Sequence, residues 1–374
     1  MSKKAIVIGG GFAGCLSAHL LKQKGYTDIT LIESANFLGG GCKTLWYGPH
    51  PYTLGPRHFL TQDRKVWDFM NKYCPMSMHG QEEIGQEFFT FIEDDQKFFH
   101  FPIHQDELPE MSGYEDIKNE IEENKNKVKT DNNLEEYWLN SVGPTLYNKF
   151  VNKYSKKMWD IESNTEITDF GFTPKGVALQ TGSKVAWKDA FSGFPYDKYG
   201  FDKYFDIATE NVNVCLNTFV NEFDVENNRL KTGDEWHNYD ILVSTISPEI
   251  LLKSCYGDLR WAGRDFLKIV LPVEKALPDH VFFLYYANNE PFTRIVEYKK
   301  YYKYKHPYTL LGIEMPSNGK NKLYPYPMKK DQDLHKKYIE SLPKNVFNLG
   351  RNATYRYLDM GATIQQAFKV SEDW

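Results

Sequence analysis

The 374-residue chain is 41% hydrophobic and 25% charged, an ordinary balance for a globular protein, and its length favours roughly two or three domains. Its net charge of −5 argues against a general nucleic-acid binder, which is normally basic. No stretch reaches the roughly 20 apolar residues of a membrane span, and the start, Met-Ser-Lys-Lys before a strand pattern, predicts no signal peptide. We therefore expect neither a nucleic-acid partner nor a membrane partner.

The number and spacing of the cysteines bear on disulfide bonds, metal binding and cellular location. They are Cys15, Cys42, Cys74, Cys215 and Cys255. Their number is odd and no two form C-x-x-C, so the sequence suggests neither a disulfide framework nor a zinc site. We expect no bound metal and a reducing, cytoplasmic location.

The first predicted elements lie within residues 5–41. An apolar run over 5–8 predicts a buried strand, a helical spacing of apolar residues follows and ends at Gly25, and a second strand covers 29–32. Between the first strand and the helix stands G-x-G-x-x-G, and the second strand runs into an acid. The candidate cofactor-binding residues of this stretch are Gly9, Gly11, Phe12, Ala13, Gly14, Glu33, Gly40 and Gly41.

Each part of this fingerprint has a physical reason. Gly9 permits a tight turn, Gly11 lets the backbone approach a pyrophosphate, and Gly14 allows close packing of helix on strand. The N–H groups at the helix start and the helix dipole favour phosphate charge, and Glu33 can accept hydrogen bonds from a ribose diol. Because Glu33 is followed after five residues by Gly39-Gly40, as in flavoenzymes, FAD is expected rather than NAD.

Further elements follow along the chain. Aromatic-rich alternation predicts hairpins over 85–101 and within 280–315, and residues 134–160 predict two helices broken at Gly143-Pro144. Residues 112–133 are highly charged and predict a solvated helix and loop. Short strands over 212–216, which contains the cofactor-binding candidate Val214, and over 240–246 predict returns to the nucleotide-binding domain. A last return, strand–turn–helix, covers 347–368.

With these segments placed, the chain resembles the UDP-galactopyranose mutase family, the flavin-dependent nucleotide-sugar mutases. The similar blocks are KVWDFMN at 65–71, FHFP at 99–102, SVGPTLYNKFVNKYSKKMW at 141–159, PFTRIVEYK at 291–299 and LGRNATYRYLDM at 349–360. The last two are the more specific. An arginine in P-[YF]-T-R and a G-R…Y…D-M ending have little reason to occur together elsewhere.

The resemblance implies an α/β fold with a Rossmann-like FAD-binding domain, an inserted helical bundle and an antiparallel β-sheet domain. It places the discontinuous FAD-binding domain at 1–78, 196–246 and 344–374, and the helical insertion at 104–165. The antiparallel sheet and substrate domain then comprises 79–103, 166–195 and 247–343.

The resemblance also implies a reaction. The family interconverts pyranose and furanose forms of a nucleotide-diphosphate sugar with no net redox, through attack of reduced FAD N5 on the anomeric carbon. The implied partners are that sugar nucleotide and NAD(P)H or another reductant, with a homodimer left open. A role in polysaccharide biosynthesis follows from such products.

Motif by motif, the resemblance implies site residues. Arg294 matches an arginine near flavin and diphosphate, and Arg351, after Gly350, matches a second. Tyr326 and Tyr355 match phosphate-binding tyrosines. Tyr154 matches the tyrosine that stacks on the nucleobase, and Trp159 an aromatic beside the sugar. Asp359 and Met360 match the segment that closes over the flavin, and Gly350, Arg351, Asp359 and Met360 are also cofactor-binding candidates.

Two places depart from the family pattern. Where the family has two histidines beside the flavin, this chain has Arg57 and Leu60, so either Arg57 takes that role or His58 swings in from the next position. Within 165–190, where the family has a phosphate-binding arginine and a sugar-side tyrosine, the best register gives Lys175 and Ala186 or Trp187. The sugar and the nucleotide are therefore left open.

Two other functions fit the first fingerprint. One is an FAD-dependent oxidoreductase of the amine-oxidase type, which has no diphosphate to neutralise and so no need for paired arginines. The other is a non-catalytic flavin-binding relative that lost its chemistry at Arg57 and Leu60. Comparing oxidised with reduced protein on nucleotide sugars separates these hypotheses.

Overall fold

The computed structural model describes residues 3–55, 58–78, 85–125, 131–168, 179–187, 189–318 and 321–374. The chain divides into two compact units. Unit 1 comprises Met1–Met78, Asp189–Arg260 and Asp331–Trp374, and unit 2 comprises His79–Lys188 and Trp261–Lys330. Each unit is described by itself below.

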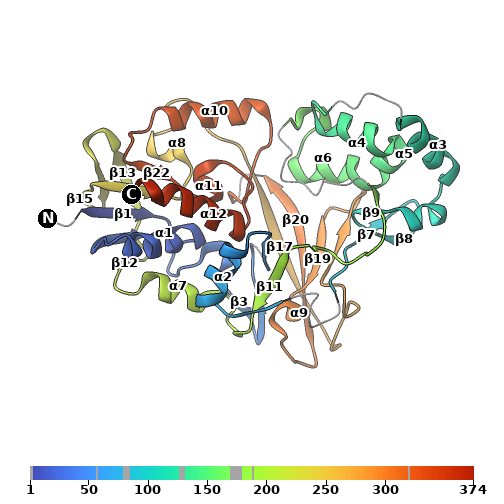
Figure 1. Cartoon of the computed structure of the whole chain (residues 1–374), viewed down its shortest axis with the longest axis horizontal. Coiled ribbons are helices and arrows are strands. Elements are labelled where there is room, and N and C mark those ends of the chain that lie inside the picture. The colour runs from blue at the N-terminus through green and yellow to red at the C-terminus, as the bar shows by residue number, and fades with distance from the viewer. Residues whose placement is uncertain are drawn as a thin grey trace. The chain divides into compact units, whose positions relative to one another are not determined.

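The described part of unit 1 is built on a five-stranded parallel sheet (Figure 1). Its strands, in sheet order, are β12 (Asn213–Cys215), β2 (Asp28–Ile32), β1 (Lys4–Ile8), β16 (Ile241–Ser244) and β22 (Val346–Asn348). The central strand β1 is KAIVI, and both of its faces are covered. Ile6 and Ile8 join Leu242 in one apolar cluster, whereas Val7 points toward the helix α1 (Phe12–Gln23). This burial on both faces explains the continuous apolar run in the sequence.

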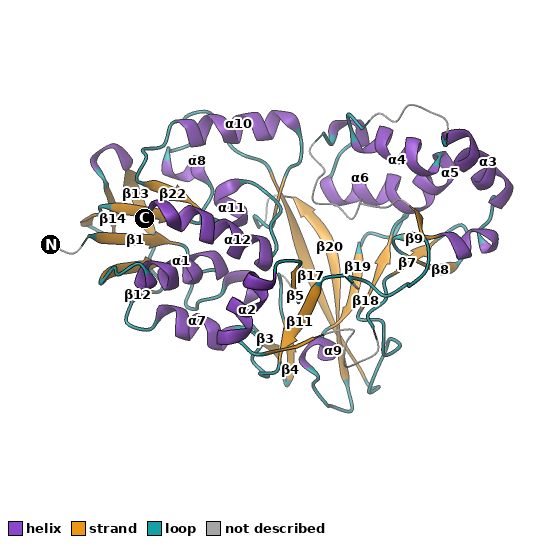
Figure 2. Cartoon of the chain, in the orientation of Figure 1, coloured by secondary structure: helices purple, strands orange, loops and turns teal. Residues whose placement is uncertain are grey.

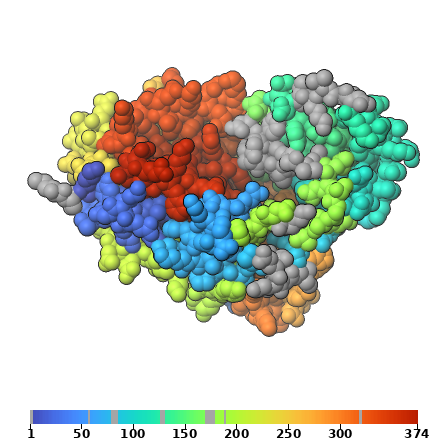
Figure 3. Space-filling model, in the orientation of Figure 1, coloured from blue at the N-terminus to red at the C-terminus, as the bar shows by residue number. Residues whose placement is uncertain are grey.

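Helices complete unit 1. They are α1, α2 (Arg64–Tyr73), α7 (Asp202–Thr209), α8 (Pro248–Leu251), α10 (Lys329–Glu340), α11 (Gly350–Thr354) and α12 (Met360–Val370). The helix α1 packs against both α7 and α12, so elements from the two ends of the chain meet (Figure 1). In Figure 3 the red C-terminal residues accordingly lie beside the blue N-terminal ones.

Smaller antiparallel sheets flank the parallel one within unit 1. They are β3 (Leu45–Tyr47) with β4 (His50–Tyr52); β5 (Phe59–Thr61) with β11 (Phe191–Pro195) and β6 (Met76–Met78); and β13 (Val220–Asp224) with β14 (Arg229–Thr232) and β15 (Glu235–Asn238). Leu230 and Phe223 of the last sheet bury the face of β1 that carries Ile6.

The described part of unit 2 is built on a seven-stranded sheet (Figure 2). Its strands, in sheet order, are β21 (Tyr324–Pro325), β17 (Trp261–Leu271), β20 (Thr309–Asn318), β19 (Arg294–Glu297), β18 (Phe283–Tyr286), β7 (Phe89–Ile92) and β8 (Lys97–His100). All neighbours are antiparallel except β18 and β7, which run parallel. A separate pair joins β9 (Ile103–His104) to β10 (Leu179–Gln180).

The helices of unit 2 gather beside β7, β8 and β9 (Figure 1). They are α3 (Tyr114–Asn124), α4 (Leu134–Val142), α5 (Pro144–Tyr147), a π-helical turn η3 (Asn148–Asn152) and α6 (Lys153–Trp159), with α9 (Lys299–Tyr302) elsewhere in the unit. Gly143, at φ +86°, separates α4 from α5, as the sequence predicted. Trp138 and Phe150 are buried in the core that these helices share with the sheet.

Short 3₁₀ helices complete the described elements: η1 (Gly40–Cys42), η2 (Gln105–Glu110), η4 (Asn164–Glu166), η5 (Val225–Asn227) and η6 (Ser371–Asp373). Both predicted hairpins are present, and the predicted fold class is confirmed: a Rossmann-like α/β part with inserted helices and a largely antiparallel sheet. The strand β17 was not among the sequence predictions. The three-domain boundaries stay a prediction, because helices and antiparallel sheet fall in one unit here.

Two features are absent from the described residues. None of their helices combines the length and the apolar character that a bilayer crossing requires. Nor do these residues contain a group of three or more histidine, cysteine, aspartate or glutamate side chains suited to a metal ion.

Candidate active site

The glycine turn between β1 and α1 is packed backbone against backbone. Gly9 has φ +92°, a region that favours glycine, and an added Cβ would lie 2.3 Å from Oγ1 of Thr245. At Gly14 a Cβ would lie 1.8 Å from the carbonyl oxygen of Gly9. The helix can therefore approach the strand this closely only with glycine at position 14.

A second glycine segment lies against this turn. The N–H of Gly39 donates to the carbonyl of Gly10 at 2.8 Å, and an added Cβ on Gly40 would lie 3.2 Å from Cα of Gly11. Gly41 is held by Gly55, whose N–H donates to its carbonyl at 2.7 Å. The glycine turn lies next to Gly40 and Gly41, which the same fingerprint predicted as cofactor-binding.

The start of α1 suits a phosphate group. Gly11 is its N-cap residue, no side chain caps the helix, and no acidic residue stands in its first turn. A Cβ on Gly11 would meet nothing within 4 Å. Uncapped N–H groups beside open space are what a pyrophosphate requires. The ring of Phe12 is buried, with its centroid 5.8 Å from that of Tyr204.

Glu33 lies at the end of β2, beside the turn. Its carboxylate accepts hydrogen bonds from the N–H of Gly10 at 2.6 Å and from the N–H of Ala35 at 2.7 Å. These contacts fix the carboxylate next to the glycine turn, where a ribose diol could reach its remaining lone pairs. Val214 lies on the adjacent strand, paired with Leu31. The residues present therefore fit an adenine dinucleotide.

The C-terminal segment reaches the same turn. Gly350 has φ +84°, and an added Cβ would lie 2.6 Å from Cβ of Ala13 in the first turn of α1. Asp359 caps α12 through the N–H of Ala362 at 2.7 Å, and burial raises the pKa of its carboxyl group although that hydrogen bond and Arg351 act in the opposite direction. Met360 is buried.

Arg351 and its neighbouring tyrosines differ from the sequence expectation. The guanidinium of Arg351 donates to the carbonyl of Leu358 at 2.8 Å and lies 4.5 Å from the ring centroid of Tyr357. Tyr355, predicted as a phosphate ligand, is fully buried, stacks on His335 and donates its hydroxyl to the carbonyl of Arg260. In this structure Tyr355 therefore packs the core of unit 1, and the tyrosine beside Arg351 is Tyr357, which the sequence analysis missed.

The two thiols near the glycine turn are inert. Burial raises the pKa of Cys15 and the pKa of Cys42 to about 12 each. A thiol with such a pKa holds its proton at neutral pH and is a poor nucleophile. Both cysteines therefore act as small buried side chains.

Arg294 opens β19 in unit 2 and is held on several sides. Its Nε lies 3.3 Å from Oε2 of Glu314, a buried carboxylate on the paired strand β20. Its guanidinium carbon lies 5.5 Å from the ring centroid of Tyr285, on β18. Tyr154 of α6 contacts the same Tyr285 ring, at 6.0 Å between centroids. The structure thus brings both Arg294 and Tyr154 next to the ring of Tyr285.

A second arginine–aromatic cluster lies in the same unit. Trp159 and Tyr326, both predicted, are buried with ring centroids 6.0 Å apart. Tyr324 contacts Trp159, and the guanidinium carbon of Arg264 lies 4.7 Å from the Tyr324 ring centroid. Arg264 is 1% exposed, yet the sequence analysis missed it. Its only signal was an arginine within the apolar stretch that forms β17.

The residues at the two departures from the family pattern are only partly described. Arg57 and Lys175 fall outside the described residues. His58 is partly buried. Trp187 packs on Phe88 at 4.7 Å between ring centroids, and the N–H of Ala186 donates to the carbonyl of Gln86 at 2.8 Å. The alternatives at these two departures from the family pattern stay predictions.

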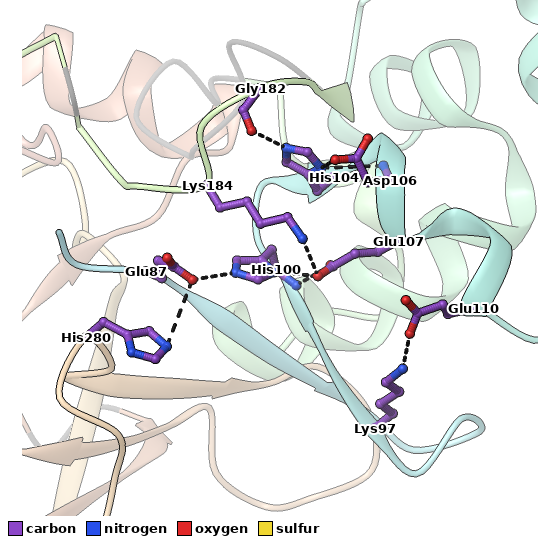
Figure 4. A network of polar contacts seen from close by, with 10 residues as sticks. All are labelled: Glu87, Lys97, His100, His104, Asp106, Glu107, Glu110, Gly182, Lys184 and His280. Atoms are coloured by element: carbon purple, nitrogen blue, oxygen red, sulfur yellow. Dashed lines mark hydrogen bonds and ion pairs between the residues drawn. The ribbon is translucent and has the colours of Figure 1, made fainter. Parts of the chain in front are cut away.

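The segment before Ala186 joins a polar network centred on His100 (Figure 4). The His100 ring lies between two carboxylates, 2.5 Å from Oε1 of Glu107 and 2.8 Å from Oε2 of Glu87. Lys184 reaches Glu107 at 3.0 Å, and a ring nitrogen of His104 bonds the carbonyl of Gly182 at 3.1 Å. The network ties residues 182–184 to the hairpin of β7 and β8.

Comparisons with known proteins agree with this geometry. A family model described as UDP-galactopyranose mutase matches residues 149–357, and one described as NAD(P)-binding Rossmann-like domain matches residues 7–73. A probable UDP-galactopyranose mutase from Klebsiella pneumoniae is 22% identical, with coverage of 100% of this chain and 95% of its own. The dTDP-fucopyranose mutase of Escherichia coli is 25% identical, with coverage of 99% and 97%.

Solved structures show the same fold. A crystal structure of reduced UDP-galactopyranose mutase has a TM-score of 0.83 at 16% identity, covering 99% of this chain and 95% of that one. A putative protoporphyrinogen oxidase from Exiguobacterium has a TM-score of 0.72 at 13% identity. Because the first family model matches more than half of the 374 residues, the chain belongs to the UDP-galactopyranose mutase family, whose members are isomerases.

Proposed function

We propose that this protein is a flavin-dependent mutase that interconverts the pyranose and furanose forms of a nucleotide-diphosphate sugar, with reduced FAD as cofactor. The observation that supports it most is the family match over residues 149–357, because this range includes both arginine segments, Arg294 and Arg351. The sugar and the base of the nucleotide are left open, since the two full-length relatives are named for different substrates.

The chemistry needs a nucleophile for the anomeric carbon and stabilisation of a departing diphosphate. Reduced FAD, when bound, supplies the nucleophile at its N5, and the sugar undergoes no net oxidation. NAD(P)H or another reductant would supply the electrons. The residues of this chain bind the cofactor at the glycine turn and present cations to the phosphates. A reducing, cytoplasmic setting belongs to the proposal, because the five cysteines are free thiols.

In this proposal Arg294 stabilises the charge that develops on the diphosphate. A guanidinium donates two parallel hydrogen bonds to a phosphate, and it does so most effectively where it is already oriented and shielded from water. The side chain of Arg294 is 13% exposed, its Nε lies 3.3 Å from Oε2 of Glu314, and its guanidinium lies over the ring of Tyr285. Arg351, in unit 1, is the second arginine that we assign to phosphate binding, with Tyr357 beside it.

The aromatic residues of unit 2 would bind the rest of the substrate. Tyr154 is half-buried and offers a ring face to a nucleobase, and such stacking contributes about 1–3 kcal/mol per base. Trp159 and Tyr326 are buried against each other. Their part in sugar and phosphate binding stays a prediction, because packing alone also explains their position.

The test is turnover by Arg294→Ala. We expect reduced wild-type protein to convert UDP-galactose or dTDP-fucose between ring forms, which chromatography separates. The variant should lose about 100–1,000-fold in kcat, as removal of one preorganised donor to a developing charge does. The bound flavin absorbance should remain. Arg64→Ala serves as the matched control, because Arg64 is an exposed arginine of unit 1 paired with Asp68.

Three outcomes would contradict the proposal. Turnover by the oxidised protein with consumption of oxygen would favour an amine-oxidase-like oxidoreductase, the alternative that shares the first fingerprint. Full activity of Arg294→Ala would remove the arginine from the diphosphate. Inactivity of the reduced wild type on every nucleotide sugar would favour the non-catalytic flavin-binding relative.

A further inference from the structure

One lysine holds the loop that leads into Arg294. Lys157 lies on α6, between Tyr154 and Trp159. Its ammonium group donates toward the carbonyl oxygens of Tyr286 at 3.1 Å, Asn288 at 3.2 Å, Glu290 at 2.7 Å and Phe292 at 2.9 Å. Alternate carbonyls of one loop therefore converge on a single cation.

This loop connects β18 to β19, and Arg294 follows it directly. The N–H of Tyr286 donates to the carbonyl of Thr293 at 3.1 Å, and the N–H of Thr293 donates to the carbonyl of Glu314 at 2.9 Å. Glu314 is also the carboxylate that contacts Arg294. The loop therefore ends at Thr293, whose backbone bond to Glu314 places the following Arg294.

A second contact ties the same loop to the same helical segment. The side-chain amide of Asn288 donates to the carbonyl of Lys149, in the π-helical turn before α6, at 3.0 Å. Lys149 itself is buried and pairs with Asp95 at 2.8 Å. Because the helical segment is anchored in this way, the ammonium of Lys157 fixes the loop to a rigid element.

The chemistry of lysine suits this arrangement. An ammonium has three N–H donors around one point, so it can serve several carbonyls that converge from different directions. A guanidinium is a planar fork and matches two parallel acceptors instead. Burial lowers the pKa of Lys157 to about 8, so the group is still mainly cationic at neutral pH.

We propose that Lys157 is a positioning residue for Arg294: it clamps the β18–β19 loop to α6 and so fixes Arg294 relative to Tyr154 and Trp159 on that helix. The inference rests on the proposed function, in which Arg294 meets the diphosphate. It assigns Lys157 no contact with substrate. Its effect on turnover passes through the loop.

The experiment compares Lys157→Met with Lys157→Arg and with a control, Lys153→Met, an exposed lysine on the same helix. Misplacing a reacting group by about 1 Å can cost about 100-fold in rate, so Lys157→Met should lower kcat about 100-fold with a small change in KM. Lys157→Arg should recover part of the loss because it keeps charge and donors. Lys153→Met should match the wild type.

A double-mutant cycle separates positioning from general damage. If Lys157 acts through Arg294, the effect of Lys157→Met should shrink to about 3-fold or less in an Arg294→Lys background, because coupled residues are non-additive. Hydrogen exchange should also quicken at residues 286–294 in Lys157→Met and stay unchanged in Lys153→Met. Equal losses in both backgrounds, or unchanged exchange in that loop, would overturn the inference.

The two proposals fail in different ways. A wild type without mutase activity would refute the proposed function while the hydrogen-exchange comparison still decides whether Lys157 holds the loop. An active wild type with an additive cycle would refute the positioning role alone.

Discussion

Glycine 14 and glycine 11 have different tasks in the same turn. A Cβ at Gly14 would fall 1.8 Å from the carbonyl oxygen of Gly9, well inside any allowed contact between backbone and side chain. A Cβ at Gly11 would meet no atom of the described residues within 4 Å, and its φ of −68° is open to any residue. The first glycine therefore serves folding, and the second leaves room for a ligand.

This difference predicts opposite phenotypes. Gly14→Ala should lower the free energy of unfolding of the apoprotein by about 1–3 kcal/mol, since the helix must shift away from β1. Gly11→Ala should leave that free energy nearly unchanged and weaken FAD binding, because its methyl group fills the space next to the phosphate-binding N–H groups. Urea unfolding of apoprotein and flavin titration measure the two effects. Equal behaviour of both variants in both measurements would refute the assignment.

Among the elements, the hairpin of β7 and β8 depends on pH through His100. Burial acts to lower the pKa of His100, yet its bonds with Glu107 and Glu87 raise the pKa above the ordinary value of 6.5. Burial likewise acts to raise the pKa of Glu107, but the bonds from His100 and Lys184 lower it to about 2. Each partner thus stabilises the charged form of the other.

The directions of these two pKa shifts define the pH range in which the network stabilises the fold. A raised histidine pKa contributes stability that is full below pH 6.5 and is lost as pH rises through the folded pKa. A lowered glutamate pKa contributes stability that is full above pH 4.5 and is lost as pH falls from there toward about 2. The network should therefore stabilise unit 2 most between pH 4.5 and 6.5.

The measurement is the difference in unfolding free energy between wild type and His100→Asn, from urea melts at several pH values. The difference should be about 1–3 kcal/mol near pH 5.5 and should decrease toward alkaline pH. Taking a difference is necessary because burial lowers the pKa of His19 to about 4, which gives that histidine the opposite pH dependence. A difference that is constant from pH 5 to pH 9 would contradict the charged network.

At the scale of the whole molecule, the cofactor should link distant segments of the chain. Unit 1 is assembled from three separate stretches, and its glycine turn, in the first stretch, packs against Thr245 of the second and Gly350 of the third. A ligand that binds the turn stabilises all three together. Its effect on stability depends on the ratio of its concentration to its dissociation constant.

FAD should therefore raise the melting temperature of the apoprotein in a concentration-dependent way, contributing about 2.7 kcal/mol at 100 times its dissociation constant. FMN should raise it much less, because it lacks the adenosine and second phosphate that Glu33 and the glycine turn are placed to bind. Differential scanning calorimetry with each flavin, and with NAD as a further comparison, tests this. A larger shift with NAD or FMN than with FAD would contradict the assignment of the cofactor.

Much of the fold could be predicted from sequence because its signals are local. The turn from Gly9 to Gly14, the strand before it and Glu33 after it lie within 40 residues, and each follows from the backbone geometry of a strand–helix–strand unit. The pair Gly143-Pro144 predicted the break between two helices, and in the structure Gly143 has a φ of +86°. The two hairpins could be predicted because aromatic-rich alternating residues flank a turn in each. The long strand β17 was missed because its residues are half exposed and do not alternate regularly.

The site was harder to predict because its contacts join residues far apart in the chain. Sequence indicated Arg294 and Arg351, but only the folded chain placed Glu314 and Tyr285 around one of them and Tyr357 beside the other. Both Tyr355 and Tyr357 look equivalent in the string YRY, and only the folded chain shows that Tyr355 is buried whereas Tyr357 lies beside Arg351.

The sequence by itself determined the dinucleotide fold and the two arginine motifs, because short-range backbone geometry and residue type carry those signals. The tertiary structure alone decided which groups surround each cation, as with Arg264 against the ring of Tyr324 and Lys157 among four carbonyls. The physical reason is that burial and convergence of acceptors depend on segments more than 100 residues apart, which leave no local pattern.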